Sequence, residues 1–230
     1  MPALKVVEKK VNMKQYLDET EYATKNLFQL IWDEEKKFRA VYQEYEKVKD
    51  RLEELEEQAA TDDIDPNKDS LSLIVRKAIH RKSLKWARNN LKDYGIYVME
   101  KKLAVEAKRS SIAFLSGAVL QIAKQGLSIV HGKPEKWPSG RVVCGVPLSQ
   151  IIRYARNQAM HYEEGLHEEE KKCFETLNAH LSEDQKLDIT QNMATRILEL
   201  LGWIEYETYK MDMLSQFEKK EEKKEQNIYA

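Results

Sequence analysis

Three polar residues of one short segment have side chains suited to chemistry on a phosphate: Arg156, Asn157 and His161. Histidine titrates near neutral pH, so it can accept and donate a proton during a reaction. The guanidinium fork of arginine matches the oxygens of a phosphate and stabilises negative charge that develops on them. Asparagine can orient either partner by hydrogen bonding. Together these side chains suit proton transfer and charge stabilisation at a phosphate group.

The segment from 156 to 161 reads Arg-Asn-Gln-Ala-Met-His. This Arg-x4-His pattern, with Asn next to Arg, resembles the signature of the HEPN superfamily. HEPN proteins are helical domains, and many are metal-independent endoribonucleases of prokaryotic defence and toxin–antitoxin systems. The resemblance extends over residues 70–217 and implies that Arg156 and His161 are catalytic, with Asn157 as a supporting residue. It also implies a homodimer, because HEPN nucleases typically bring two such motifs together at one cleft.

Helical geometry constrains how these residues can meet. On a regular helix, Arg156 and His161 lie about 140° apart around the axis, so they do not share a face. Arg153, Asn157 and His161 do share one, because they are spaced at i, i+4 and i+8. A catalytic site therefore needs a local distortion near the helix end or a second chain, and the spacing adds Arg153 as a substrate-binding residue. The opposite face carries an apolar stripe: Leu148, Ile152, Ala155 and Ala159.

The same residues also have structural interpretations. His161 could bond the last carbonyls of a helix, where the dipole favours a cation, and Arg156 could pair with Glu163 or Glu164. The sequence after the motif is rich in glutamate, unlike an RNA-binding groove. Two alternatives to the nuclease follow: a non-catalytic HEPN module that binds a partner protein, such as a nucleotidyltransferase antitoxin, and a coiled-coil scaffold. The glutamates are Glu163, Glu164, Glu168, Glu169 and Glu170.

A long helix is expected before the motif-bearing part of the chain. The sequence from Val11 to Ala59 has no Gly or Pro and is rich in good helix formers. An apolar stripe with alternating spacings of three and four predicts a helix that packs on its own domain or forms a coiled-coil dimer. The stripe consists of Phe38, Val41, Tyr45, Val48, Leu52, Leu55 and Ala59.

A second helix is expected from Ser70 to Tyr94, with a kink or short loop at Gly95. No acidic residue occurs between Leu71 and Lys92, so one face lacks the mixed charges of an ordinary solvated surface. Such a face favours binding of phosphate or an acidic partner, with a plain solvated face as the alternative. The basic residues assigned to substrate binding are Lys77, Arg81, Lys85, Arg88 and Lys92.

The remaining sequence predicts a central buried helix from Ile96 to Val130 and then an irregular segment, residues 132–147, that holds six Gly or Pro residues. Trp137 in this segment is a loop anchor or a surface on which a base could stack. Further helices are expected at about 148–162, 168–178 and 189–201. Gly202 is expected to end the third of them before a last helix that continues to about Phe217.

Composition narrows the class of protein. The 230 residues carry a net charge of −1 and include 8 Gly, 5 Pro and 2 Cys, which argues against a polycation, an all-β fold and a disulfide framework. We expect an all-α helical bundle with a long N-terminal helix (1–60), a HEPN-like domain (70–217) and a charged C-terminal tail (218–230). No cofactor or metal motif is found. The longest apolar window, Ile112 to Ala123, is too short to span a bilayer, so a cytoplasmic protein without membrane contacts is expected.

Overall fold

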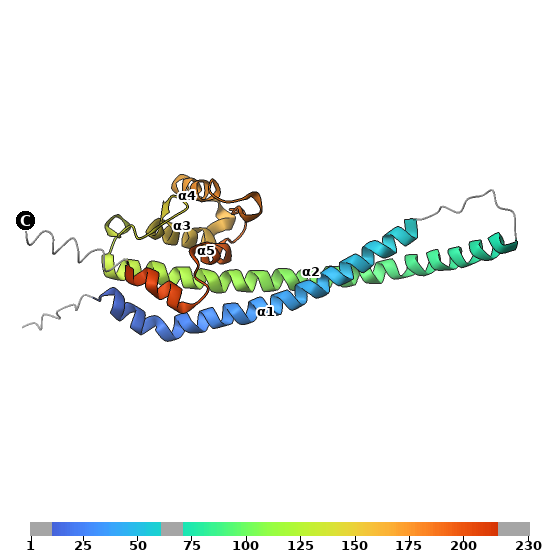
Figure 1. Ribbon diagram of the computed structural model, residues 1–230, viewed down its shortest axis with the longest axis horizontal. Helices are drawn as coiled ribbons and strands as arrows, with labels where there is room; N and C mark the ends of the chain where they lie inside the picture. The colour runs from blue at the N-terminus through green and yellow to red at the C-terminus, as the bar shows by residue number, and fades with distance from the viewer. Residues whose placement is uncertain (1–10, 61–70, 216–230) are drawn as a thin grey trace, which may run out of the picture. The chain divides into compact units, whose positions relative to one another are not determined.

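A computed structural model describes residues 11–60 and 71–215 and confirms the all-α fold (Figure 1). The charged tail expected at 218–230 lies outside the described residues. The sheet in the described part is one antiparallel pair of two-residue strands. The elements are α1 (Met13–Ala60), α2 (Leu71–His131), η1 (Pro134–Lys136), β1 (Val142–Val143), β2 (Val146–Pro147), α3 (Leu148–His161), η2 (Tyr162–Glu164), α4 (Glu168–Asn178), η3 (Glu183–Gln185) and α5 (Ala194–Leu201), and residues 206–215 are also helical.

The described residues form two compact units, and each of the long helices α1 and α2 contributes a segment to both. The first unit, called here the helical hairpin, consists of residues 34–60 and 71–109. The second, called here the core unit, consists of residues 11–33 and 110–215. The sequence-based ranges 1–60 and 70–217 stay a prediction.

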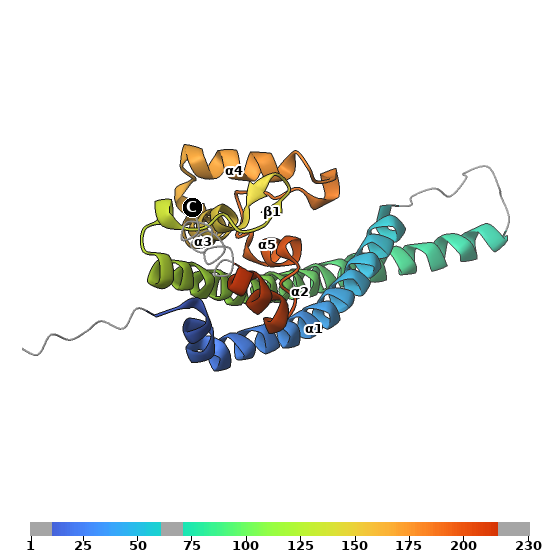
Figure 2. The ribbon, with the colours of Figure 1, turned by 60° about the vertical axis from the view of Figure 1, so that its left-hand side comes forward.

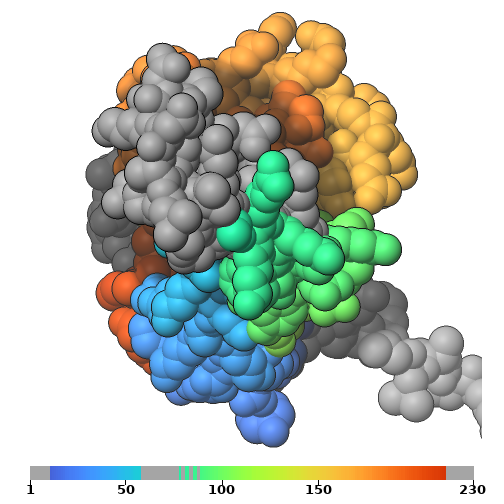
Figure 3. Space-filling view, turned by 90° about the vertical axis from the view of Figure 1, so that its right-hand side faces the viewer, coloured from blue at the N-terminus to red at the C-terminus, as the bar shows by residue number. Residues whose placement is uncertain are grey.

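In the helical hairpin, the two segments pack antiparallel, because ascending residues of α1 meet descending residues of α2. Glu34 forms an ion pair with Lys108 at 2.7 Å, and Glu44 forms one with Lys101 at 2.7 Å. Atoms of the two helices lie next to each other in the space-filling view of Figure 3. The apolar stripe from Phe38 to Leu55 is half-buried or buried at every position. The stripe therefore packs within the chain, on the side of α1 that meets α2, and a coiled-coil dimer stays a prediction.

Helix α2 runs without interruption through Gly95, so the expected kink or loop there is wrong. A glycine inside a helix costs only about 1 kcal/mol, which packing against α1 offsets. By length and apolar composition alone, Asn89–His131 passes as a membrane-spanning helix, but half of its apolar window is buried, as in a core helix. The lack of membrane contacts and the cytoplasmic location stay predictions.

The core unit is organised around residues 110–131 of α2, which lie between the first turns of α1 and the group formed by α3, α4 and α5 (Figures 1 and 2). On one side, the Tyr16 hydroxyl donates to the carbonyl of Ile122 at 2.8 Å. On the other, α2 packs against α3 at Gly117, where a Cβ atom would lie in ordinary van der Waals contact with the Cβ of Ala159, at 3.6 Å. Leu120 and Leu127 are fully buried, so the central buried helix expected at 96–130 is confirmed for its second half. Its first half is not a buried helix of its own: it continues α2 from Leu71, and Ile96, Met99 and Leu103 are exposed.

The shorter helices follow the expected boundaries with one exception. Helix α4 matches residues 168–178, and α3 matches 148–162 to within one residue. Helix α5 begins at Ala194 and not near residue 189. The Asp188 carboxylate instead accepts hydrogen bonds from the Thr190 backbone N–H at 3.0 Å and the Thr190 hydroxyl at 2.7 Å. These local bonds stabilise a turn in competition with the helix.

Candidate functional site

Helix α3 is fixed within the core unit by its buried face. Its apolar stripe faces inward as expected, and each of its four residues is at most 3% exposed. The amide of Gln158 is also fully buried; its oxygen accepts from the Met193 backbone N–H at 3.0 Å, and its nitrogen donates to the carbonyl of Ile189 at 3.3 Å. These bonds fasten the loop before α5 to α3. The outward positions of α3 are therefore presented on a fixed support.

Arg156 is held by neutral amides. Its Nε donates to Oε1 of Gln121 on α2, and its Nη1 donates to Oδ1 of Asn157 at 3.3 Å. Among the described residues it forms no ion pair, so the expected alternative partners Glu163 and Glu164 do not neutralise it. The Nη2 group has no hydrogen bond within the described part of the chain. The guanidinium is oriented and half-buried, yet it keeps a donor edge without a partner among the described residues.

Asn157 connects Arg156 to a buried carboxylate. Its Nδ2 donates to Oε1 of Glu170 at 2.8 Å. Glu170 is 5% exposed, lies in the first turn of α4 and accepts a second bond from the backbone N–H of His167 at 3.2 Å. This capping arrangement satisfies an orphan donor at the start of α4. Asn157 thus orients Arg156 and ties α3 to α4.

His161 closes α3 and is half exposed. Its Nδ1 lies 3.4 Å from Oε1 of Glu164 in the turn that follows. Its backbone leaves the helical region, with φ −136° and ψ 18°, so the regular helix ends at the motif. The structure gives no direct contact between His161 and Arg156. In one chain, Arg156 and His161 therefore lie on the same helix, α3, without touching each other.

No known family, curated protein or solved structure matches this chain. Among the described residues, no group of three or more His, Cys, Asp or Glu side chains could hold a metal ion.

Arg153 lies one turn before Asn157, as the spacing predicts, and lines a cavity of about 300 Å³ beside Trp137 and Tyr154. Its guanidinium carbon is 5.3 Å from the centre of the Tyr154 ring. Within the described part of the chain, Arg153 has no ion pair. It is a second arginine of α3 whose charge is not neutralised.

The basic face of α2 belongs to the helical hairpin, whereas the motif belongs to the core unit. Arg81, Lys85 and Lys92 are exposed. Lys77 and Arg88 belong to the same helix, but their side chains lie outside the described part of the structure. The expected role of all five in substrate binding stays a prediction.

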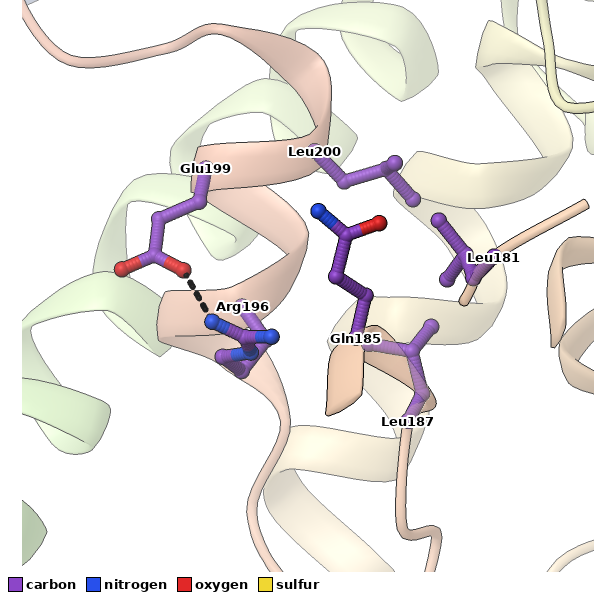
Figure 4. Close-up of a pocket in the computed structure, with 6 residues that line it drawn as sticks. All are labelled: Leu181, Gln185, Leu187, Arg196, Glu199 and Leu200. Atoms are coloured by element: carbon purple, nitrogen blue, oxygen red, sulfur yellow. Dashed lines mark hydrogen bonds and ion pairs between the residues drawn. The ribbon is translucent and has the colours of Figure 1, made fainter. Parts of the chain in front are cut away.

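A second cavity of about 310 Å³ is lined by Arg196, Glu199 and Gln185 together with leucines of the 181–200 region (Figure 4). Here Nη1 of Arg196 lies 2.9 Å from Oε2 of Glu199, so its charge is neutralised by its neighbour on α5. The two cavities have similar volumes, but among the described residues only the arginine at this one is paired with a carboxylate.

Two residues that shape the site were not expected as site residues. Gln121 comes 35 positions before Arg156, and its role depends on how α2 packs on α3, which no local pattern indicates. In the sequence, Glu170 belongs to a group of glutamates that is unfavourable for RNA binding. Its place three residues after His167, at the start of α4, is the signal that separates it from the others, because that spacing is typical of a helix cap.

Proposed function

We propose that this chain is a HEPN-like, metal-independent endoribonuclease that acts as a homodimer in the prokaryotic cytoplasm, in a defence or toxin–antitoxin system. RNA is the substrate, Arg156 and His161 are the catalytic residues, and Asn157 positions Arg156. The observation that supports the proposal most is the charge of Arg156, which is oriented by amides and lacks a carboxylate partner.

Arg141, in the same unit, is an arginine whose charge is paired. Arg141 donates two hydrogen bonds to Asp212, at 2.7 Å and 2.8 Å, and its Nη2 also donates to the carbonyl of Leu201 at 2.6 Å. Such an arginine has its charge balanced and its donors used for structure. Arg156 is also oriented by hydrogen bonds, but its partners are neutral amides, so its positive charge is left for an external anion. A phosphate is the anion whose geometry an arginine fork matches best.

The reaction proposed for these groups needs no additional reactant. An imidazole takes the proton of a 2′-hydroxyl, whose oxygen attacks the adjacent phosphorus while the bond to the 5′-oxygen breaks. A proton is returned to the 5′-oxygen, which gives a 2′,3′-cyclic phosphate and a 5′-hydroxyl. Arg156 stabilises the negative charge on the phosphoryl oxygens in the transition state. Because Arg156 and His161 do not meet in one chain, the proposal places the reaction where the ends of two α3 helices face each other.

The test is cleavage of a fluorescently labelled single-stranded RNA with EDTA present. The variants Arg156→Ala and His161→Ala should each lose about 10²- to 10⁴-fold in rate. Arg196→Ala is the control, because it removes an arginine whose charge is already paired with Glu199, and it should cleave at the wild-type rate. Equal rates for all four proteins would reject the assignment, as would a monomeric mass for the active wild type in light scattering.

A second candidate is a non-catalytic HEPN module that binds a partner protein such as a nucleotidyltransferase antitoxin. The contact between His161 and Glu164 favours it, because a carboxylate beside the imidazole repels a phosphate. Under this proposal, affinity purification from the native host recovers one stable companion protein, and Glu164→Gln does not produce RNA cleavage. Recovery of the chain alone would count against it.

A further inference from the structure

The cavity beside Arg153 is built from the irregular segment before α3 and from the first turns of α3 itself. Its lining includes Pro134, Trp137 and Ser139 from the segment, and Ser149, Arg153 and Tyr154 from the helix. All of these residues belong to the core unit. A volume of about 300 Å³ lies at the lower end of the range found for small-molecule sites. It is of a size for one nucleotide, not for an extended ligand.

Two aromatic rings of the cavity are fixed by their polar ends. Nε1 of Trp137 donates to the carbonyl of Gly132 at 2.9 Å, and the Tyr154 hydroxyl donates to Oε2 of Glu169 at 3.1 Å. Both side chains are half-buried, so part of each remains accessible. Rings that are immobilised in advance lose little conformational entropy when a flat ligand stacks on them. Unpaired nucleobases are recognised in this way.

Arg153 supplies the positive charge of the cavity. Its guanidinium is placed over the Tyr154 ring and forms no ion pair with a described residue. Glu135 also lines the cavity and does not pair with Arg153, so both groups remain available to a ligand. An unneutralised arginine favours a phosphate, while Glu135 and Gln150, which also line the cavity, provide acceptors and a donor for the edge of a base.

The cavity beside Arg196 lacks these features although its volume, about 310 Å³, is nearly the same. In the described part of the chain, it is lined by leucines, Gln185, Arg196 and Glu199, without an aromatic ring, and the arginine is paired with the glutamate. Volume alone therefore does not distinguish the two cavities. The combination of fixed aromatic rings and an unpaired cation does.

We propose that the cavity formed by Trp137, Arg153 and Tyr154 binds one nucleotide of single-stranded RNA, with its base against Trp137 and its phosphate at Arg153. This inference rests on the proposed function and adds a substrate-recognition site to it. Arg153 lies eight residues before His161 on the same face of α3, which is about 12 Å along the helix axis. The bound nucleotide is therefore a neighbour of the cleaved linkage and not part of it, and the cavity selects where along an RNA the cut falls.

The experiment measures binding of a fluorescein-labelled, fully 2′-O-methylated RNA octamer of mixed sequence to the full chain by fluorescence anisotropy. This probe cannot be cleaved through a 2′-hydroxyl. Loss of a stacking contact should weaken binding about 5- to 100-fold in Trp137→Ala, whereas Trp137→Phe keeps an aromatic face and should stay within about 3-fold of wild type. Arg153→Ala should weaken binding and reduce the slope of log affinity against log salt by about one. Arg196→Ala is the matched control and should bind as wild type does.

Several results would overturn the inference. It fails if Trp137→Ala and Arg153→Ala bind the octamer as tightly as Arg196→Ala, or if the wild type does not bind the octamer. Adenosine and uridine monophosphates, tested separately, distinguish the two sources of a nucleotide: if they bind in a Trp137-dependent manner while the octamer does not, the cavity serves a free nucleotide and the RNA assignment is wrong. Circular dichroism of each variant checks that it is folded.

The outcome is separable from that of the proposed function. A chain that binds the octamer through Trp137 and Arg153 but never cleaves RNA refutes the endoribonuclease and supports the recognition site. A chain that cleaves RNA but tolerates loss of both side chains in the binding assay does the opposite.

Discussion

Replacing Glu170 with alanine should lower the free energy of unfolding by about 3 kcal/mol. The carboxylate is 5% exposed and accepts hydrogen bonds from Asn157 Nδ2 at 2.8 Å and from the His167 N–H at 3.2 Å. A hydrogen bond to a charged group contributes about 1.5–3 kcal/mol, and the longer second bond falls at the low end of that range. Because Asn157 is only half-buried, water can replace its lost partner, which keeps the total near the lower sum.

Glu168→Ala is the matched control. Glu168 lies in the same first turn of α4, so both substitutions remove a carboxylate that interacts favourably with the helix dipole. Its side chain is 79% exposed, and its contact is an ion pair with Lys171 at 3.1 Å. Exposed pairs of this kind contribute about 0–1 kcal/mol. The difference between the two variants therefore isolates the buried hydrogen bonds of Glu170.

Urea unfolding followed by far-ultraviolet circular dichroism measures the difference. In thermal melts, a loss of about 3 kcal/mol corresponds to a decrease of about 6–12 °C in Tm for a protein of this size. Glu170→Gln, which keeps the volume and one acceptor oxygen, should fall between wild type and Glu170→Ala. Equal urea midpoints for Glu170→Ala and Glu168→Ala would refute the argument that the buried bonds stabilise the site.

Three further predictions concern the helices and the buried titratable groups. Gly95→Ala should raise the free energy of unfolding by up to about 1 kcal/mol, since the new Cβ meets nothing within 4 Å. Gly126→Ala should lower it by about 2 kcal/mol, since its Cβ would lie 2.6 Å from Cε1 of Tyr16. Thermal melts in which Tm changes with the same sign for both variants would contradict this. Burial raises the pKa of Tyr16 to about 12. The stability that its neutral form contributes should therefore be complete below about pH 10 and lost as the pH rises to about 12. Urea midpoints that stay constant between about pH 10 and about pH 12 would argue against it. Burial also raises the pKa of the Cys173 thiol to about 12, so an aromatic disulfide reagent at pH 8 should label the half-buried Cys144 at least about 10-fold faster, and equal rates would be inconsistent with the structure.

The sequence predicts the helices well where local chemistry decides their ends. Gly165, with φ 84°, lies just beyond the turn that follows α3, and Gly202, with φ 69°, ends α5. Glycine tolerates these values at little cost, so its position in the sequence is a reliable stop. Gly95 looked the same in the sequence but is an ordinary helical residue, because packing against α1 outweighs a cost of about 1 kcal/mol. Whether a glycine ends a helix or is carried through it depends on contacts that are distant in sequence.

The candidate site was predictable in part. The face shared by Arg153, Asn157 and His161, and the buried stripe opposite to it, follow from helical periodicity. The partner of Arg156 does not, because Gln121 reaches it only where α2 and α3 approach each other at Gly117. Local sequence predicts which side chains α3 presents, but the tertiary packing determines which of them remain charged and unpaired.

The contacts between the first and last described helices bear on how the protein is made. Phe28 lies 6.1 Å from Tyr209, measured between ring centres, and the Tyr206 hydroxyl donates to the carbonyl of Leu17 at 3.4 Å. The second of these contacts joins residues 189 positions apart. During synthesis, the first turns of α1 emerge from the ribosome long before residues 206–215 exist to pack against them. Until then, the apolar side chains of α1 remain exposed and accessible to chaperones. Completion of the core, and with it any chemistry at α3, has to wait until nearly the whole described chain has been synthesised.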